Sequence, residues 1–174
     1  HIQPFLENNV PDLWTYYCCG QTVGVSNRLM SMPSARNRIL GWQMFKFNIK
    51  GFLHWGYNFW FSQYSKKPLN PFIVTDADDS FPSGDAFLVY PGEDGSPIPS
   101  IRQLVFFEGL QDLRALELLQ SFIGRDGLLK WLDDECAEPL TFNVYPTTAS
   151  WLLEMREKIN MKIKDSCRLI AEES

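Results

Sequence analysis

The chain has 174 residues and a mass of 20.1 kDa, which suits one domain or a large part of one. Hydrophobic residues make up 45% of it and charged residues 21%, a balance typical of a core-forming globular protein and not of a disordered chain. The formal net charge of −5 excludes a general electrostatic attraction to nucleic acid or anionic lipid.

The first predicted elements alternate between strand and helix. Residues 13–18 are aromatic and β-branched, which favours a strand. After a loop, Ser34 can cap a helix that runs to about Asn48, because apolar residues recur there every three or four positions. Residues 52–57 predict a second strand, and its continuous apolar start indicates burial on both faces.

A long irregular segment separates this second strand from a third one. Residues 58–85 hold three prolines and an acidic run and show no helical period. A loop of this length is usually functional or flexible. Residues 86–90 then predict a third buried strand, followed by a loop rich in glycine and proline.

The rest of the chain is predicted to be helical. Ser100 and Gln103 form the pattern of a capping box, and Gly124 can terminate the helix that follows. Residues 126–136 predict a short helix. A last helix begins near Thr148, and its apolar residues step by three or four, so one face is expected to dock on the domain.

Strands interleaved with amphipathic helices predict an α/β fold with a parallel sheet. Three strands cannot close a barrel and leave open edges. The pattern therefore predicts either a small open sheet or one side of a larger (β/α)8 barrel.

Several classes of site are not expected. No apolar run reaches the length of a membrane span, and no glycine-rich phosphate loop is present. The four cysteines lack the spacing of a zinc site, so we expect no metal or cofactor and predict free thiols, which slightly favour the cytoplasm. Because the chain begins at His1 without a basic, apolar leader, we expect a fragment, a processed product or a tag scar.

Aromatic residues gather at the end of each predicted strand. In parallel α/β folds these carboxyl ends hold the active site, and aromatic rings suit the apolar faces of sugars. The alternative is core packing, and for Trp14 and Tyr57 both interpretations stay open. The residues predicted to form a sugar pocket are Tyr16, Trp55, Asn58, Trp60 and Tyr90.

Carboxylates offer a second chemistry, since glycosidases need two of them. Glu93, Asp94 and the aspartates of residues 76–85 are candidates, although aspartate in such loops mostly makes turns. His54 is interpreted as a core histidine with its hydrogen bonds satisfied, because no nucleophile motif accompanies it. Arg102 is expected to pair with Asp112 or with a neighbouring loop.

Five segments, in this order, resemble the C-terminal part of the glycoside hydrolase family 123 catalytic domain: residues 13–18, 38–42, 51–60, 85–92 with 99–102, and 109–112. The resemblance covers residues 12–120. It implies a (β/α)8 barrel, TIM-type, to which residues 12–120 supply the last three βα units. Residues 121–174 would be closing helices, so residues 1–174 form a single domain or a barrel fragment.

The resemblance also implies hydrolysis of terminal β-linked N-acetylgalactosamine with retention and without metal or cofactor. In that family a Glu protonates the leaving oxygen, a neighbouring Asp orients the 2-acetamido group, and the acetamido oxygen attacks the anomeric carbon. The family's Asp-Glu pair lies on an earlier strand. Asp134-Glu135, the one Asp-Glu step here, follows a helix instead. We therefore expect pocket walls in this chain but no catalytic residue, and no activity from it alone.

Two other functions stay open. A carbohydrate-binding module would use the aromatic residues without chemistry, and a stand-alone α/β enzyme would use Glu93 or an aspartate of the 76–85 loop. A truncated barrel would expose apolar surface, so we expect self-association or a missing N-terminal part of the same protein, with carbohydrate as the ligand and neither nucleic acid nor membrane as partner.

Overall fold

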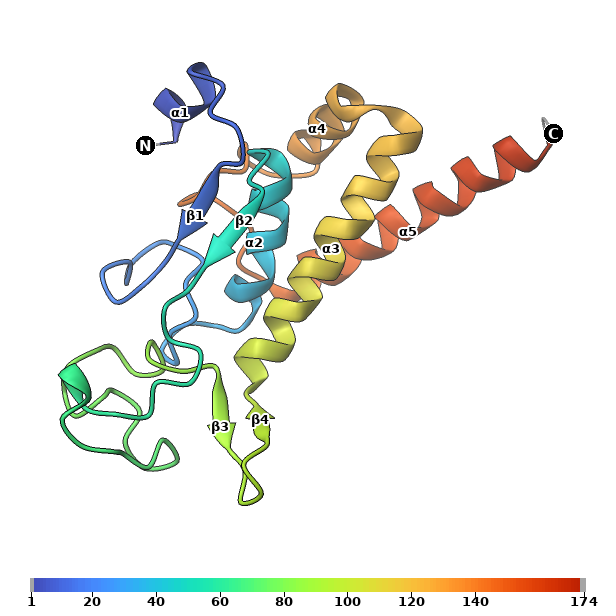
Figure 1. Cartoon of the computed structure of the whole chain (residues 1–174). Coiled ribbons are helices and arrows are strands. Elements are labelled where there is room, and N and C mark those ends of the chain that lie inside the picture. The colour runs from blue at the N-terminus through green and yellow to red at the C-terminus, as the bar shows by residue number, and fades with distance from the viewer. Residues whose placement is uncertain (1, 173–174) are drawn as a thin grey trace.

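The structure, a computed structural model, describes residues 2–172. Its central unit is a parallel pair of strands, β1 (Trp14–Tyr16) and β2 (Gly51–Leu53), joined by helix α2 (Ala35–Lys46). Trp14 pairs with Gly51 and Tyr16 pairs with Leu53, so the carboxyl ends of the two strands lie side by side. Figure 1 shows α2 behind this pair. The predicted strand–helix–strand order at the start of the chain is confirmed.

Helices form a layer on one face of the parallel pair (Figure 1). They are α3 (Ile101–Ile123), α4 (Arg125–Asp134) and α5 (Ala149–Glu172) together with α2, and a short helix α1 (Gln3–Glu7) precedes β1. The largest apolar cluster joins the four long helices, and it includes Trp42, Leu116, Leu132 and Ile159. The predicted docking of the last helix is confirmed for its first half, where Leu152, Met155 and Ile159 are buried, whereas Cys167 and Ile170 further along the same face are exposed.

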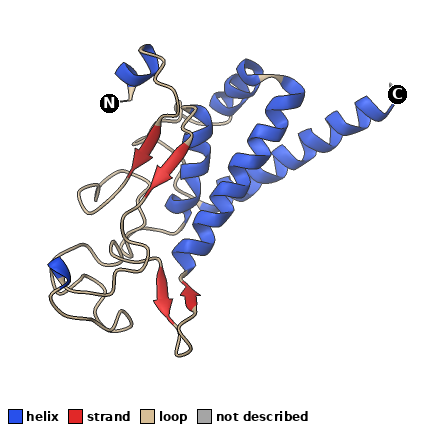
Figure 2. Cartoon of the chain, in the orientation of Figure 1, coloured by secondary structure: helices blue, strands red, loops and turns tan. Residues whose placement is uncertain are grey.

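The third predicted strand does not join the parallel pair, and this prediction is wrong. Residues Val89–Pro91 form β3, which pairs antiparallel with β4 (Pro97–Pro99) in a separate hairpin. Figure 2 shows the two strand pairs apart. The reason is local: Gly95, at a φ of 83°, turns the chain back upon itself, and residues 97–99 are close enough in sequence to take the free edge of β3.

The described strands therefore form two small sheets, one parallel and one antiparallel, and no closed barrel. The fold is mixed α/β, as expected, but the parallel part holds two strands instead of three. The strands are also shorter than predicted. His54 and Trp55 lie just beyond β2, and Leu53 is exposed, so β2 is not buried on both faces.

Helices α2 and α3 cross in direct backbone contact at Gly41 and Gly109. A Cβ atom on Gly41 would lie 1.9 Å from the backbone oxygen of Gly109, so no side chain fits at this crossing. One turn further along α3, the fully buried Asp112 accepts hydrogen bonds from Arg38 and Trp42 of α2 and from Arg156 of α5. This carboxylate ties three helices together.

The predicted helix ends are only partly confirmed. The Ser100 hydroxyl caps α3 by accepting the Gln103 backbone N–H at 3.3 Å, and Gly124, at a φ of 77°, ends the helix. The Gln103 side chain instead donates to the Tyr57 hydroxyl, so the reciprocal half of the capping box is absent. Ser34 makes no capping hydrogen bond, because its own backbone is already helical.

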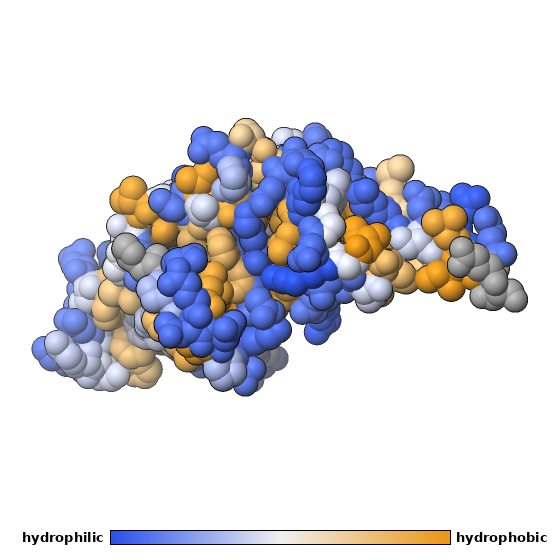
Figure 3. Space-filling view, turned by 90° about the horizontal axis from the view of Figure 1, so that it is seen from above, coloured by the Kyte–Doolittle hydropathy of each residue, from blue (hydrophilic) through white to orange (hydrophobic). Residues whose placement is uncertain are grey.

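One face of the parallel pair carries helices and the other is bare. Side chains alternate along a strand, so Trp14, Tyr16 and Leu53 share the face opposite α2, where they are 60%, 44% and 49% exposed. Viewed from above, hydrophobic residues are scattered among hydrophilic ones, and some lie at the outer end of α5 (Figure 3). Within residues 2–172, no helix is long and apolar enough to cross a membrane.

Candidate functional site at the carboxyl ends of the parallel strands

Polar and aromatic side chains meet where the two parallel strands end. Tyr16 is the last residue of β1, and His54 and Trp55 directly follow β2. Because the carboxyl ends of β1 and β2 are paired, these side chains come from adjacent positions. Asp85 reaches the same place from the long loop, 30 residues after Trp55.

Asp85 is the fully buried acid of this site. Its Oδ2 accepts a hydrogen bond from Trp55 Nε1 at 2.9 Å, and its Oδ1 lies 3.5 Å from His54 Nε2. The His54 Nδ1 accepts the Gly56 backbone N–H at 3.2 Å. A neutral imidazole therefore carries its proton on Nε2, the nitrogen that faces Asp85.

His54 was expected to be a core histidine with both nitrogens satisfied. Its side chain is buried, but only Nδ1 has a hydrogen bond; Nε2 has an acidic neighbour beyond hydrogen-bonding distance. The prediction is therefore right that His54 is buried and wrong that both of its ring nitrogens have hydrogen-bond partners. The sequence holds no local signal for this, since Asp85 is 31 positions away.

Two thiols flank Tyr16 on the β1 side of the site. Cys18 and Cys19 follow the strand, and the Cys18 backbone is anchored by Gln21 and Asn27. Although Tyr16 is 44% exposed, partial desolvation of its phenol, its hydrogen bond with Cys18 and the charge of Asp85 raise its pKa to about 12. The Tyr16 hydroxyl is thus a hydrogen-bond donor over the whole physiological range.

Three of the predicted pocket residues share one aromatic cluster. Trp55, Trp60 and Tyr90 are partly buried and pack against the buried cluster formed by Ala77, Ala86 and Phe87. Trp60 Nε1 also donates to the Val89 backbone oxygen at 3.0 Å, while Tyr90 stacks on Phe72 with ring centroids 4.8 Å apart. Core packing and a pocket wall are both compatible with this arrangement, so the sugar-binding role of these rings stays a prediction.

Asn58 and Tyr57 lie at the rim of this cluster and are exposed. Asn58 forms an isolated antiparallel bridge with Phe87, so the segment after β2 is held by backbone pairing to the segment before β3. Asn58 is exposed, and its role in sugar binding stays a prediction. The Tyr57 hydroxyl accepts a hydrogen bond from Gln103.

Arg102 holds the loop that carries Asp85. Its guanidinium donates to the backbone oxygens of Gly84 at 2.5 Å and Phe87 at 2.7 Å, on either side of Asp85. Of the two partners expected for Arg102, the neighbouring loop is therefore the correct one. Asp112 pairs with Arg38 and Arg156 instead.

A strained turn supports the outer side of the cluster. Ala77, Asp78 and Asp79 all have positive φ, between 56° and 65°, which costs about 1–2 kcal/mol for each residue that is not glycine. The turn places Phe81 edge-on against Trp55, with ring centroids 5.0 Å apart. Packing of Phe81 and Ala77 into the cluster offsets this strain.

The other acidic candidates lie apart from these aromatic rings or in solvent. Asp94 sits in the turn of the β3–β4 hairpin, where hydrogen bonds from Ser96 lower its pKa. Asp78 and Asp79 are exposed. In the part of the chain that the structure describes, no three His, Cys, Asp or Glu side chains gather as metal ligands would.

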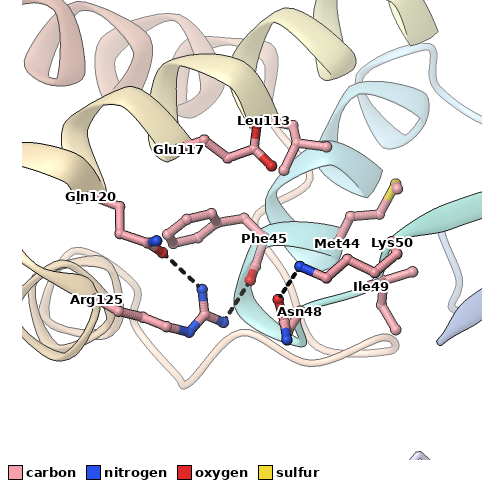
Figure 4. Close-up of a pocket in the computed structure, with 9 residues that line it drawn as sticks. All are labelled: Met44, Phe45, Asn48, Ile49, Lys50, Leu113, Glu117, Gln120 and Arg125. Carbon is pink, nitrogen blue, oxygen red and sulfur yellow. Dashed lines mark hydrogen bonds between the residues drawn. The ribbon is translucent and has the colours of Figure 1, made fainter. Parts of the chain in front are cut away.

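A separate hollow of about 200 Å³ lies at the opposite end of the strands (Figure 4). It is lined by Asn48, Ile49 and Lys50, which precede β2, and by residues of α2 and α3. Arg125 in this hollow donates to Gln120 and to the Phe45 backbone oxygen, which satisfies the end of α2. The polar groups of this hollow satisfy hydrogen bonds at the helix ends, so we assign the hollow a role in stability.

Comparison with known families identifies the class of protein to which the chain belongs. The profile of the glycoside hydrolase 123 catalytic domain matches residues 1–119. The chain belongs to glycoside hydrolase family 123. The resemblance found in the sequence is thereby confirmed, and membership implies a glycosidase that binds carbohydrate. No curated protein matches the sequence.

All the residues at the carboxyl ends of β1 and β2 lie inside the family 123 match, as does Asp85. Residues 120–174, which include α4 and α5, lie outside it. Among the site residues, sequence reasoning singled out Tyr16 and Trp55 and treated Asp85 as one of several loop acids. It missed the link between them, because that link is made only in three dimensions.

Proposed function

We propose that this family 123 chain forms part of the sugar pocket of a glycosidase that removes terminal β-linked N-acetylgalactosamine. The observation that carries the proposal is that Tyr16 ends β1 beside the end of β2, directly after which Trp55 donates a hydrogen bond to the buried Asp85. Active sites of parallel α/β folds lie at that edge. Aromatic rings there offer the apolar faces against which a sugar ring packs.

Substrate assistance is the mechanism that we propose, because the family resemblance implies it. The Asp and Glu that it requires would come from a strand upstream of β1. Asp134 and Glu135 do not suit that role, since they lie at the end of α4 and are ion-paired with Lys130 and Lys158. The part played by this chain is to bind and orient the sugar, and the 174-residue chain alone is expected not to hydrolyse it.

The test is a titration of the chain with methyl β-N-acetylgalactosaminide, followed by tryptophan fluorescence. We expect saturable binding that is lost in Trp55→Ala and Trp60→Ala. Tyr64→Ala is a matched control, because this aromatic residue of the same loop is 78% exposed and lies outside the cluster. Equal binding by all three variants would contradict the proposed pocket.

Hydrolysis is measured in parallel with p-nitrophenyl β-glycosides, using the 174-residue chain beside the protein made from the complete reading frame. Release of p-nitrophenol from the N-acetylgalactosaminide by the complete protein only is the expected result. Hydrolysis by the 174-residue chain would show that the catalytic acids lie within it, and activity on another glycoside would change the substrate.

One observation favours a second candidate function, a binding module without chemistry. The Trp14 indole lies flat over Gly51 on the bare face of the parallel pair, where a Cβ atom on Gly51 would be 2.3 Å from the ring. A flat, exposed aromatic ring of this kind is a platform for a sugar. This function predicts that Trp14→Ala abolishes sugar binding while Trp55→Ala does not, and that no form of the protein is hydrolytic.

A further inference from the structure

Two fully buried aspartates in this protein accept a hydrogen bond from a tryptophan indole, and they differ in how their charge is compensated. Asp112 accepts from Trp42 Nε1 at 3.0 Å and is also paired with Arg38 and Arg156. Asp85 accepts from Trp55 Nε1 at 2.9 Å, but no arginine or lysine pairs with it among the described residues. Its Oδ1 has no hydrogen-bond partner there.

This difference indicates that the Asp112 carboxylate has a structural role and that the Asp85 carboxylate has another role. A buried carboxylate without an ion pair lowers stability, because a single hydrogen bond replaces only part of its lost hydration. Asp112 avoids that loss through its two arginines. Asp85 has no such ion pair among the described residues: the positive charge that acts on it is that of Arg102, whose guanidinium is hydrogen-bonded to the backbone oxygens of Gly84 and Phe87 and not to the carboxylate.

We propose that Asp85 is a positioning residue for carbohydrate binding, which orients the Trp55 indole and the His54 imidazole at the carboxyl end of β2. The inference rests on the proposed function. The Trp55 ring is held along its edge by Asp85 and by contacts with Phe59 and Phe81, so the direction of its face is set. The His54 Nε2 lies 3.5 Å from Oδ1 of the same carboxylate, with no hydrogen bond between the two atoms.

The scaffold behind Asp85 is rigid enough for this role. Arg102 fixes the backbone oxygens of Gly84 and Phe87 on both sides of it. The backbone at Gly56 approaches so closely that a Cβ atom there would lie 2.3 Å from the Asp85 backbone oxygen. A group that positions others must itself be held by such packing and hydrogen bonds.

The experiment compares Asp85→Asn with Asp112→Asn in the 174-residue chain. Both changes remove one buried charge and keep an oxygen that can accept the indole hydrogen bond. Sugar affinity is measured by following the Trp55 indole N–H signal in NMR spectra during titration with methyl β-N-acetylgalactosaminide, with Trp55→Phe to assign the signal. Thermal unfolding measures the stability of each variant.

We expect Asp85→Asn to weaken sugar binding about tenfold and to shift the Trp55 signal, since a hydrogen bond to a charged group loses strength when the charge is removed. Asp112→Asn is expected to lower the melting temperature more and to leave the affinity of the folded protein unchanged. Unchanged affinity in Asp85→Asn, while the wild-type chain binds the sugar, would overturn the inference and leave the proposed function standing.

A second pair of variants covers the case in which Asp85→Asn does not fold. His54→Gln keeps a side-chain N–H donor near the position of Nε2, whereas His54→Ala removes it. If Asp85 acts through His54, His54→Gln retains more sugar affinity than His54→Ala; equal affinities overturn that part of the inference. Failure of the wild-type chain to bind the sugar at all overturns the proposed function together with the inference.

Discussion

The Arg102 guanidinium donates a hydrogen bond to the backbone oxygen of Arg28 at 2.9 Å, so one buried arginine holds the other in place. The two guanidinium groups differ in their hydrogen bonding. Arg102 has three backbone oxygens as acceptors, whereas within residues 2–172 no nitrogen of the Arg28 guanidinium has a hydrogen-bond partner. Arg28 lies between the rings of Phe52 and Phe106, at 3.9 and 4.4 Å, and burial lowers its pKa to about 9.

Exchanging each arginine for methionine should therefore have opposite effects on stability. Arg28→Met keeps apolar contact with both rings and removes a buried cation whose N–H groups have no acceptor among the described residues, so the free energy of unfolding should stay the same or rise by about 1–2 kcal/mol. Arg102→Met leaves three backbone oxygens without a donor and should cost about 3 kcal/mol or more. Urea denaturation measures both values, and a larger loss for Arg28→Met than for Arg102→Met would contradict this account.

The crossing of α2 and α3 predicts a strong effect of adding one methyl group. Gly41→Ala would force the helices apart, because its Cβ atom meets the Gly109 backbone oxygen, and we expect a loss of about 3 kcal/mol or no folded protein. Gly127→Ala is the matched control. Gly127 lies inside α4 with nothing within 4 Å of a Cβ atom, so alanine should stabilise the helix by about 0.5–1 kcal/mol. Thermal unfolding of both variants separates the two cases, and similar melting temperatures would count against the close crossing.

Alkaline pH should destabilise the protein through Tyr17. Burial of this phenol raises its pKa above the ordinary value of 10.0, against a smaller opposing effect of Ser26 and Arg28. Between pH 10 and its raised pKa, the folded state keeps a proton that the unfolded chain loses, so this contribution to the free energy of unfolding falls as pH rises through that window.

The measurement compares wild type with Tyr17→Phe by urea denaturation at pH values from 9 to 11. The variant lacks the titrating group, so its stability should fall less steeply with pH than that of wild type. Other shifted groups contribute in both proteins. Because Arg28 and Tyr17 interact electrostatically, the difference between the two slopes reports Tyr17 together with its effect on Arg28. Parallel curves for the two proteins would show that Tyr17 does not titrate in this way.

The bare face of the parallel pair predicts self-association. Parallel sheets are normally covered on both faces, and here Trp14 and Leu53 stand exposed on one of them. We expect concentration-dependent association in sedimentation velocity, which is reduced in the double variant Trp14→Thr with Leu53→Thr. Val23→Thr is a control, since Val23 is 85% exposed but lies in a loop outside the strands. A monomer at every concentration would contradict the prediction that this face needs a partner.

The sequence by itself determined the family and the elements that rest on local patterns. The periodicity of apolar residues identified α2, α3 and α5, because a helix buries one face at fixed spacing whatever lies beyond it. The order of strand, helix and strand identified the β1–β2 pair as parallel. The same order of strands and helices placed the aromatic residues of the strand ends at the edge where active sites of parallel α/β folds lie.

Only the tertiary structure decided the pairing of β3 and the partners of the buried charges. The run at residues 86–90 has the apolar character of a parallel strand, but the nearby turn at Gly95 offers it β4 as an antiparallel partner at a lower cost in chain entropy. The local sequence does not distinguish Asp85 from Asp112, because each is an aspartate next to an apolar segment. Whether such a carboxylate meets two arginines or one histidine depends on side chains 30 to 74 positions away, and such distant contacts carry no local signal.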